Sequence, residues 1–167
     1  MDPGMAFGTG THETTRMCAG FAARHVRPGD RVMDIGCGTA ILGIVAAKRG
    51  AREVTAIDID DAAVKTAREN VERNGVSDRV HVHAGVLADM PPTANDVILV
   101  NIIAEVIIAL SSDFAGYLKR DGLLVVSGII HSRLQEVMTA CEQNGFVLME
   151  HNAQGEWDAM VYRCIGS

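Results

Sequence analysis

The stretch Val32-Met33-Asp34-Ile35-Gly36-Cys37-Gly38-Thr39-Ala40 decides the fold of this chain. An apolar run ends in two glycines one residue apart, and residues 41–47 then continue apolar nearly all round. A strand, a tight glycine turn and a buried helix form the opening of a nucleotide-binding α/β unit. Because Gly36 and Gly38 lack a Cβ, the backbone can turn sharply there and approach a ligand closely.

An acidic residue is expected about 20 residues further on, where it would hold the hydroxyls of a ribose. Asp58, the last residue of the apolar run Val54–Asp58, is in that place. The alternative is that Asp58 only caps the helix that follows.

Two classes of nucleotide-binding protein compete for this pattern. A dinucleotide-dependent dehydrogenase needs a third glycine and places a pyrophosphate at the helix N-terminus, but Thr39, Ala40 and Ile41 follow Gly38. Asp34, two residues before Gly36, would repel a pyrophosphate and suits a cationic ligand. An acidic residue followed by this glycine pair resembles the first motif of class I S-adenosylmethionine-dependent methyltransferases, whose cofactor carries an ammonium and a sulfonium.

Composition sets further bounds on the chain of 167 residues, which we expect to form a single domain over 1–167. Its net charge is −6 and it has no basic run, which disfavours nucleic acid as a direct substrate. The longest apolar segment, Val97–Leu110, is shorter than the ~20 residues that span a membrane. We expect no signal peptide, and the four scattered cysteines indicate reduced thiols in the cytoplasm.

Hydrophobic periodicity predicts strands alternating with helices. The expected strands are 31–35, 54–58, 79–83, 96–101, 123–127, 146–150 and 157–163, with helices near 13–25, 41–47, 61–74, 102–118 and 134–141. We therefore predict an α/β fold: a doubly wound, mostly parallel, seven-stranded Rossmann-like sheet with a C-terminal antiparallel hairpin. Residues 1–15 are expected to form a loop that covers the cofactor, with Thr11 as the N-cap of the first helix.

The opening segment Asp2-Pro3-Gly4-Met5-Ala6-Phe7-Gly8-Thr9-Gly10-Thr11-His12-Glu13-Thr14-Thr15 resembles the signature loop of the ribosomal protein L11 methyltransferase (PrmA) family. The resemblance continues through 34–38, 57–60, 100–104 and 124–129 and ends at Glu156-Trp157, so it covers essentially the whole chain. It implies methyl transfer from S-adenosylmethionine to lysine side chains and the N-terminal amine of one ribosomal protein.

The chain departs from the family pattern in two ways. Family members usually carry an N-terminal domain that docks the ribosomal protein, whereas we expect this sequence to hold the catalytic domain alone, either as a piece of a longer chain or as a single-domain relative, which puts the protein substrate in doubt. Without that domain we expect binding of the ribosomal protein to be weak. The family's third small glycine is replaced here by Ala40.

The resemblance places the cofactor contacts at Thr15, Gly36, Asp58 and Asn101. The chemistry of the residues agrees: Gly36 and Gly38 admit the methionine part, Asp34 balances its ammonium, and Ile59 can lie against the adenine. Thr15 can bond the methionine carboxylate, or it can be a solvated helix residue. The full expected set is Phe7, Thr11, Thr15, Asp34, Gly36, Cys37, Gly38, Asp58, Ile59 and Asn101.

Asn101 is the expected catalytic residue, because it ends the fourth strand at the ligand-binding edge of such sheets. Asn101-Ile102-Ile103-Ala104 resembles the Asn-Pro-Pro-Tyr-type motif of amine methyltransferases, in which the Asn carbonyl and the next backbone carbonyl hold the amine. Alternatively, Asn101 only satisfies backbone groups at the strand end.

The other candidate residues carry weaker signals. Phe7 can cover the cofactor, wall the acceptor pocket or anchor its loop, and His12 is a base only if it faces the acceptor. His81 and His83 share one strand face, but with no third ligand we expect them to be surface residues and expect no metal. Two other functions stay open: a small-molecule amine methyltransferase, and a cofactor-binding module without turnover.

Overall fold

The computed structural model describes residues 11–166 of the chain, and their side chains from Glu13 onward. The elements in chain order are α2 (Thr11–His25), β1 (Arg31–Ile35), α3 (Ile41–Lys48), β2 (Glu53–Asp58), α4 (Asp61–Arg73), β3 (Val80–Ala84), η1 (Leu87–Asp89), β4 (Asn95–Asn101), α5 (Ala104–Leu110), η2 (Phe114–Tyr117), β5 (Leu118–Ile130), η3 (His131–Arg133), α6 (Leu134–Gln143), β6 (Phe146–Gln154) and β7 (Trp157–Cys164).

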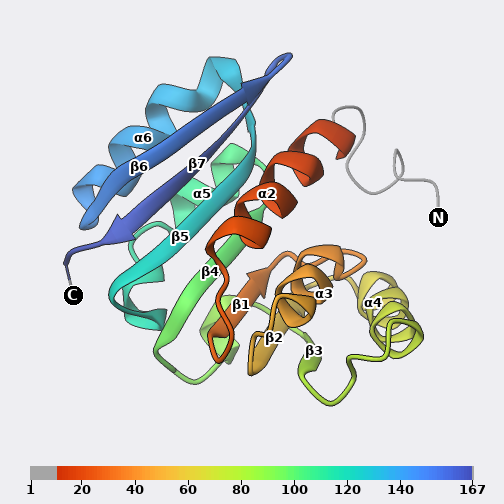
Figure 1. Ribbon diagram of the computed structural model, residues 1–167. Coiled ribbons are helices and arrows are strands. Elements are labelled where there is room, and N and C mark those ends of the chain that lie inside the picture. Colours follow the sequence, from red (N-terminus) through yellow and green to blue (C-terminus); the bar gives the residue numbers. More distant parts are fainter. Residues whose placement is uncertain (1–10, 167) are drawn as a thin grey trace.

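One seven-stranded sheet in the order β3-β2-β1-β4-β5-β7-β6 organises the described part of the chain (Figure 1). The first five strands of this order pair in parallel, while β7 runs antiparallel between β5 and β6. The strand order reverses direction between β1 and β4, and open α/β sheets bind their ligands at such a point. The predicted fold class, including the C-terminal hairpin, is confirmed.

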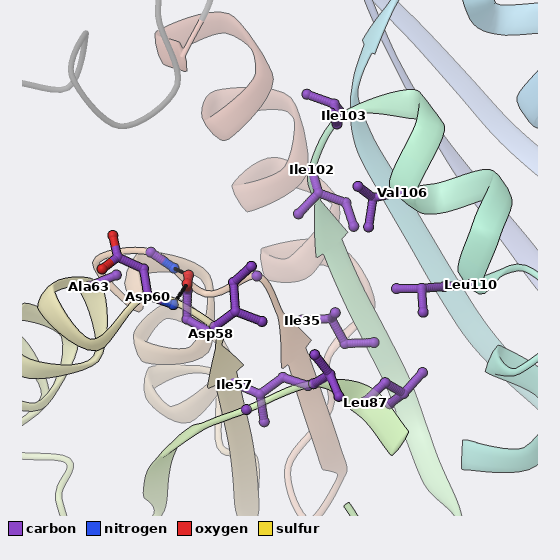
Figure 2. A pocket seen from close by; sticks show the side chains of 15 residues that line it. Ile35, Ile57, Asp58, Asp60, Ala63, Leu87, Ile102, Ile103, Val106 and Leu110 are labelled. Atoms are coloured by element: carbon purple, nitrogen blue, oxygen red, sulfur yellow. Dashed lines mark hydrogen bonds between the residues drawn. The ribbon is translucent and has the colours of Figure 1, made fainter. Parts of the chain in front are cut away.

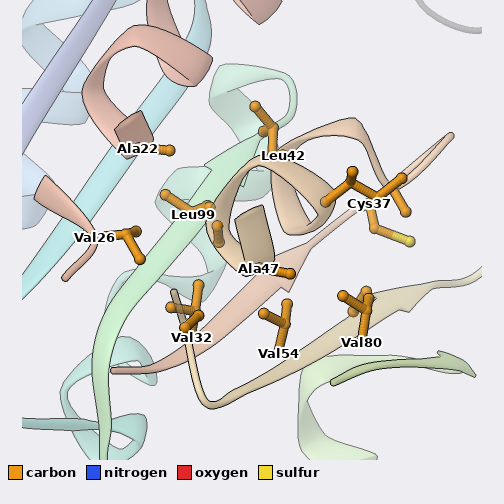
Figure 3. Close-up of a cluster of buried hydrophobic side chains, with 14 of the residues drawn as sticks. Ala22, Val26, Val32, Cys37, Leu42, Ala47, Val54, Val80 and Leu99 are labelled. Carbon is orange, nitrogen blue, oxygen red and sulfur yellow. The ribbon is translucent and has the colours of Figure 1, made fainter. Parts of the chain in front are cut away.

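Helices cover both faces of the sheet (Figure 1). On one face, α2, α3 and α4 bury small and branched side chains against the strands, as Figure 3 shows for Ala22, Leu42 and Ala47 over Val54 and Leu99. On the other face, α5 and α6 pack on a second cluster of buried residues. With both faces covered, the central strands are nearly continuous apolar runs.

The N-terminal boundary of α2 differs from the prediction. The helix begins at Thr11, so Thr11 is its first residue and not an N-cap, and residues 11–15 belong to the helix and not to the expected loop. The first turn of a helix makes no intrahelical N–H bonds, so sequence locates such a boundary only to within a residue or two.

The helix predicted to run to Leu118 is wrong in length. It ends at Leu110, where the Ser111 hydroxyl donates to the Ile108 carbonyl at 2.7 Å. Phe114, which is fully buried, then draws the chain back to the core before β5 begins at Leu118. β5 therefore starts before the predicted strand 123–127, and its register with β4 jumps from Asn95–Leu118 to Val97–Leu123.

Candidate active site

A pocket of about 520 Å³ lies at the carboxyl ends of β1, β2 and β4 (Figure 2). Its walls come from these strand ends, from the segment after β3 and from α5. The lining residues are Ile35, Gly36, Gly38, Ile57, Asp58, Ile59, Asp60, Ala63, Gly85, Val86, Leu87, Ile102, Ile103, Val106 and Leu110. Two carboxylates face a mainly apolar wall, and the described lining includes no lysine or arginine. Such a cavity suits a ligand with apolar parts and hydroxyls better than a polyphosphate.

The glycine turn forms the floor of this pocket. Gly36 (φ 70°) and Gly38 (φ 53°) both adopt left-handed backbone conformations, which glycine tolerates without strain. The N–H groups of Gly36 and Cys37 both donate to the Ile57 carbonyl at 2.9 Å, which ties the turn to the end of β2. A Cβ on Gly36 would collide with the Ile102 side chain, so the turn and the segment after β4 meet closely there. Ala40, in the place of a third glycine, is also left-handed (φ 67°).

Asp58 is held firmly at the end of β2. One carboxylate oxygen accepts the N–H of Gly38 at 2.9 Å and the other accepts the N–H of Asp60 at 2.9 Å. A carboxylate has about four acceptor positions, so both oxygens retain capacity for the hydroxyls of a ligand. The cap of α4 is Asp60, whose side chain accepts the N–H of Ala62, so Asp58 is not that cap.

Asp34 lies beneath the turn and does not line the pocket. It is fully buried, and its Oδ2 accepts the Gly43 N–H at 3.0 Å. Its Oδ1 is the one buried side-chain polar atom without a hydrogen-bond partner among the described residues. Burial is the main cause that raises the pKa of Asp34 to about 7; the Gly43 hydrogen bond opposes this rise and the charge of Asp58 adds to it. An unpartnered buried carboxylate oxygen favours a nearby positive charge.

Cys37 and Ile59 lie on opposite sides of this floor. Cys37 is buried and does not line the pocket, and burial, with the charges of Asp34 and Asp58, raises the pKa of its thiol far above the ordinary value. Ile59 is 76% exposed although it is a large apolar residue, and it lines the pocket mouth. An isoleucine so exposed beside a cavity indicates a surface that a ligand covers.

Asn101 and Thr15 lie together at the end of β4, beside the pocket and not in its lining. The Asn101 Nδ2 donates to Thr15 Oγ1 at 3.4 Å, across 86 residues of sequence. Asn101 is 8% exposed and pairs in register with Ser127 of β5. The structure thus brings two predicted residues into contact, and Ile102, the next residue, lines the pocket.

Three candidate residues lie partly or wholly outside the part of the chain that the structure describes. Phe7 falls outside the described residues, as do the side chains of Thr11 and His12. His81 and His83 are exposed on β3, as expected. Among the side chains that are described, no group of three His, Cys, Asp or Glu residues could hold a metal ion. Over the same residues, no helix is long and apolar enough to cross a membrane.

Sequence reasoning missed the pocket wall formed by Gly85, Val86 and Leu87 after β3 and by Val106 and Leu110 of α5. The glycine that directly follows β3 was a usable signal, because it marks a close backbone approach at the same sheet edge. The α5 residues gave no signal, since their apolar pattern is that of any packed helix.

Comparison with known proteins agrees with the family resemblance seen in the sequence. A model of the family described as ribosomal protein L11 methyltransferase (PrmA) matches residues 1–164. The ribosomal protein L11 methyltransferases of Acetivibrio thermocellus and Ruminiclostridium cellulolyticum are 54% identical over 167 residues and 53% identical over 166. These alignments cover 100% and 98% of this chain but 53% and 52% of the relatives, so the chain spans about half the length of the curated relatives it matches.

Solved structures agree with the sequence relatives. The crystal structure of a ribosomal protein L11 methylase from Lactobacillus delbrueckii subsp. bulgaricus matches with a TM-score of 0.86 at 31% identity, over 93% of this chain and 80% of that one. An RNA methyltransferase from Salinibacter ruber, in complex with S-adenosyl-L-homocysteine, matches with a TM-score of 0.72 over 93% and 92% of the two chains, but at 18% identity it supports the fold alone. The family model and the close relatives together show that this chain belongs to the ribosomal protein L11 methyltransferase (PrmA) family.

Proposed function

We propose that this chain binds S-adenosylmethionine in the pocket and transfers its methyl group to an amine nitrogen of ribosomal protein L11, on lysine side chains or the N-terminal amine. One observation carries the proposal: Asp58, fixed by two backbone N–H groups, faces an apolar cavity without lysine or arginine in its described lining. Asn101 lies at the same sheet edge, at the end of β4. Membership of the family supports both the cofactor and the acceptor.

Asp58 would bind the ribose, with each carboxylate oxygen accepting one hydroxyl in addition to its backbone N–H. Ile59 and Val86, which are 76% and 48% exposed at the pocket mouth, would cover the adenine faces. Burying such exposed apolar surface stabilises the complex by roughly 25 cal/mol per Å². The described lining contains no lysine or arginine, which argues against a dinucleotide, because the negative charge of its pyrophosphate needs a nearby positive charge.

The methionine part of the cofactor would lie over Gly36 and Gly38. Asp34 would attract its ammonium through the unpartnered Oδ1, directly or through water. Thr15 would bond the carboxylate, a role that its 3.4 Å contact with Asn101 leaves open because a hydroxyl can donate and accept at once. Phe7, Thr11 and Cys37 complete the proposed contacts, with Cys37 contributing its backbone.

Asn101 would act as the catalytic residue by holding the acceptor amine. Its Oδ1 and the Ile102 carbonyl would accept hydrogen bonds from the amine and direct its lone pair toward the methyl group. A lysine has an ordinary pKa of about 10.4 and must arrive neutral, and partial burial next to a cationic cofactor lowers that pKa. The cofactor supplies a methyl group on a positively charged sulfur, so the residues of this chain contribute mainly alignment and desolvation.

Recognition of L11 involves more than this pocket. Because the chain spans about half the length of its curated relatives, we propose that docking of L11 is weak for these residues alone. We also propose that the chain acts in the cytoplasm, where L11 occurs and thiols are reduced. All four cysteines of the chain are free and buried, which agrees with this location.

The test is mass spectrometry of L11 and of a pool of small amines after incubation with methyl-labelled S-adenosylmethionine. Label on L11 lysines or its N-terminal amine supports the proposal. Label only on small amines identifies a small-molecule amine methyltransferase. Binding of S-adenosylhomocysteine by calorimetry without any labelled product identifies a binding module without turnover.

A further inference from the structure

A β-bulge in β5 lies directly against the two carbonyl groups that hold the acceptor amine in the proposed function. The register with β7 shifts between Val126–Met160 and Ile129–Asp158, so β5 contains one extra residue there. Gly128 occupies the bulge with a φ of 82°, a left-handed conformation that glycine adopts without strain. The preceding Ser127 still pairs with Asn101 of β4.

The empty side of Gly128 faces Asn101 and Ile102. A Cβ on Gly128 would lie 2.7 Å from the Ile102 carbonyl oxygen, 3.0 Å from Asn101 Oδ1 and 3.2 Å from the Ile102 nitrogen. Two of these three atoms are the proposed acceptor-binding oxygens. A side chain at position 128 would therefore fill the space that both carbonyl oxygens border.

The same bulge is tied to α2 by a ring of contacts. The buried Ser127 hydroxyl donates to the Thr14 carbonyl at 2.9 Å, and the neighbouring Thr15 accepts the Asn101 Nδ2 at 3.4 Å. Asn101 closes the ring by lying against Gly128. Thr15 and Gly128 thus restrain the Asn101 side chain directly, and Ser127 acts through its bond to the α2 residue next to Thr15.

We propose that Gly128, with Ser127, is a positioning residue for methyl transfer: the bulge holds Asn101 Oδ1 and the Ile102 carbonyl in place and keeps the space between them open. This inference rests on the proposed roles of Asn101 and Ile102. It gives two residues of β5 a part in the reaction, although no residue of β5 lines the pocket.

The first test compares Gly128→Ala with Gly29→Ala. Gly29 has nearly the same backbone conformation (φ 88°), but a Cβ there meets nothing within 4 Å, so this control reproduces the backbone strain without the contact. We expect Gly128→Ala to lower the single-turnover rate of methyl transfer to L11 about 100-fold, as a misplacement near 1 Å does, with an unchanged dissociation constant for S-adenosylhomocysteine. Gly29→Ala should leave both quantities unchanged.

A double mutant tests whether Gly128 acts through Asn101. In an Asn101→Ala background, Gly128→Ala should lower the rate less than in the wild type, since Asn101 Oδ1, one of the two oxygens it displaces, is gone and only the Ile102 carbonyl remains. Equal losses in both backgrounds, or a weakened affinity for S-adenosylhomocysteine with an unchanged rate, would overturn the inference.

A measurement without turnover separates this inference from the proposed function. In NMR spectra, the Asn101 side-chain amide resonances should shift in Gly128→Ala and in Ser127→Ala, which breaks the ring without adding an atom, and stay fixed in Gly29→Ala. If wild-type protein methylates no amine, the proposed function fails and this measurement still decides the positioning role. If Gly128→Ala does not fold, Ser127→Ala supplies the same test, and unchanged Asn101 resonances in a folded variant refute the inference.

Discussion

The two halves of the ligand-binding edge are built differently. Asp58, at the end of β2, lies in an open pocket lined mainly by apolar side chains and is already oriented by two backbone N–H groups. At the ends of β4 and β5, Asn101 is 8% exposed and bonded to Thr15, outside the lining of that pocket. The first region is shaped to bind, while the second holds a few polar atoms in fixed positions. Binding and transfer should therefore respond separately to mutation.

The largest effect is expected for Asn101→Ala. Loss of an acceptor-holding carbonyl should lower the single-turnover rate by roughly 1000-fold, comparable to removal of one preorganised hydrogen-bonding group from an active site. The affinity for S-adenosylhomocysteine should fall far less than in Asp58→Ala. A rate near that of the wild type would mean that Asn101 only satisfies the end of β4.

Asp58→Ala should act on the other half. Loss of two charge-assisted hydrogen bonds should weaken binding of S-adenosylhomocysteine by roughly 2–4 kcal/mol, measured by calorimetry, while the fold survives. Asp60→Ala is the matched control, because Asp60 also lines the pocket but caps α4. That variant should lose about 1 kcal/mol of unfolding free energy and less affinity. An unchanged dissociation constant in Asp58→Ala would place the ribose elsewhere.

Asp34 gives the pocket floor a dependence on pH. Its pKa is raised to about 7 in the folded protein, from an ordinary 3.8, mainly by burial. Between these two values the unfolded chain has released the proton and the folded protein retains it, so this group's contribution to stability is full below the lower value and is lost as the pH rises toward 7.

Asp34→Asn should remove that loss. Measured by urea unfolding, the stability of the variant relative to the wild type should rise by roughly 2–3 kcal/mol between pH 5 and pH 8. The Glu150 carboxylate, whose pKa is lowered by hydrogen bonds from Arg24 and His25, is present in both proteins and cancels in the comparison. A constant difference over this range would show that Asp34 is ionised in the folded protein.

The smallest expected effect belongs to Thr15→Val, because Thr15 borders both halves. Loss of one hydrogen bond, worth about 1 kcal/mol, should weaken S-adenosylhomocysteine binding about fivefold and slow transfer to a similar degree. An effect confined to binding would assign Thr15 to the cofactor half alone. An effect confined to the rate would assign it to the acceptor half.

The sequence was most informative where function depends on local backbone. The two glycines, Asp34 and Asp58 follow one another within a single strand–turn–helix–strand unit, so their spacing predicted both the turn and the acid at the end of β2. The helix predicted to reach Leu118 failed for a non-local reason, since the burial of Phe114 ends it early.

The acceptor side was only partly predictable. The position of Asn101 at a strand end was readable, but its contact with Thr15 joins residues 86 positions apart. Gly128 directly follows the predicted strand 123–127, but the bulge that it occupies depends on the register between β5 and β7. The pattern within one strand does not locate a register shift that arises from its pairing with another strand.

The most direct test of separate binding and transfer regions is single-turnover methyl transfer to L11 with rising S-adenosylmethionine concentration, for the wild type, Asp58→Ala and Asn101→Ala. We expect Asp58→Ala to approach the wild-type rate when cofactor is saturating, whereas Asn101→Ala should stay slow at every concentration. Recovery of Asn101→Ala at saturation, or failure of Asp58→Ala to recover although it is folded and bound, would show that binding and transfer are not separated in this way.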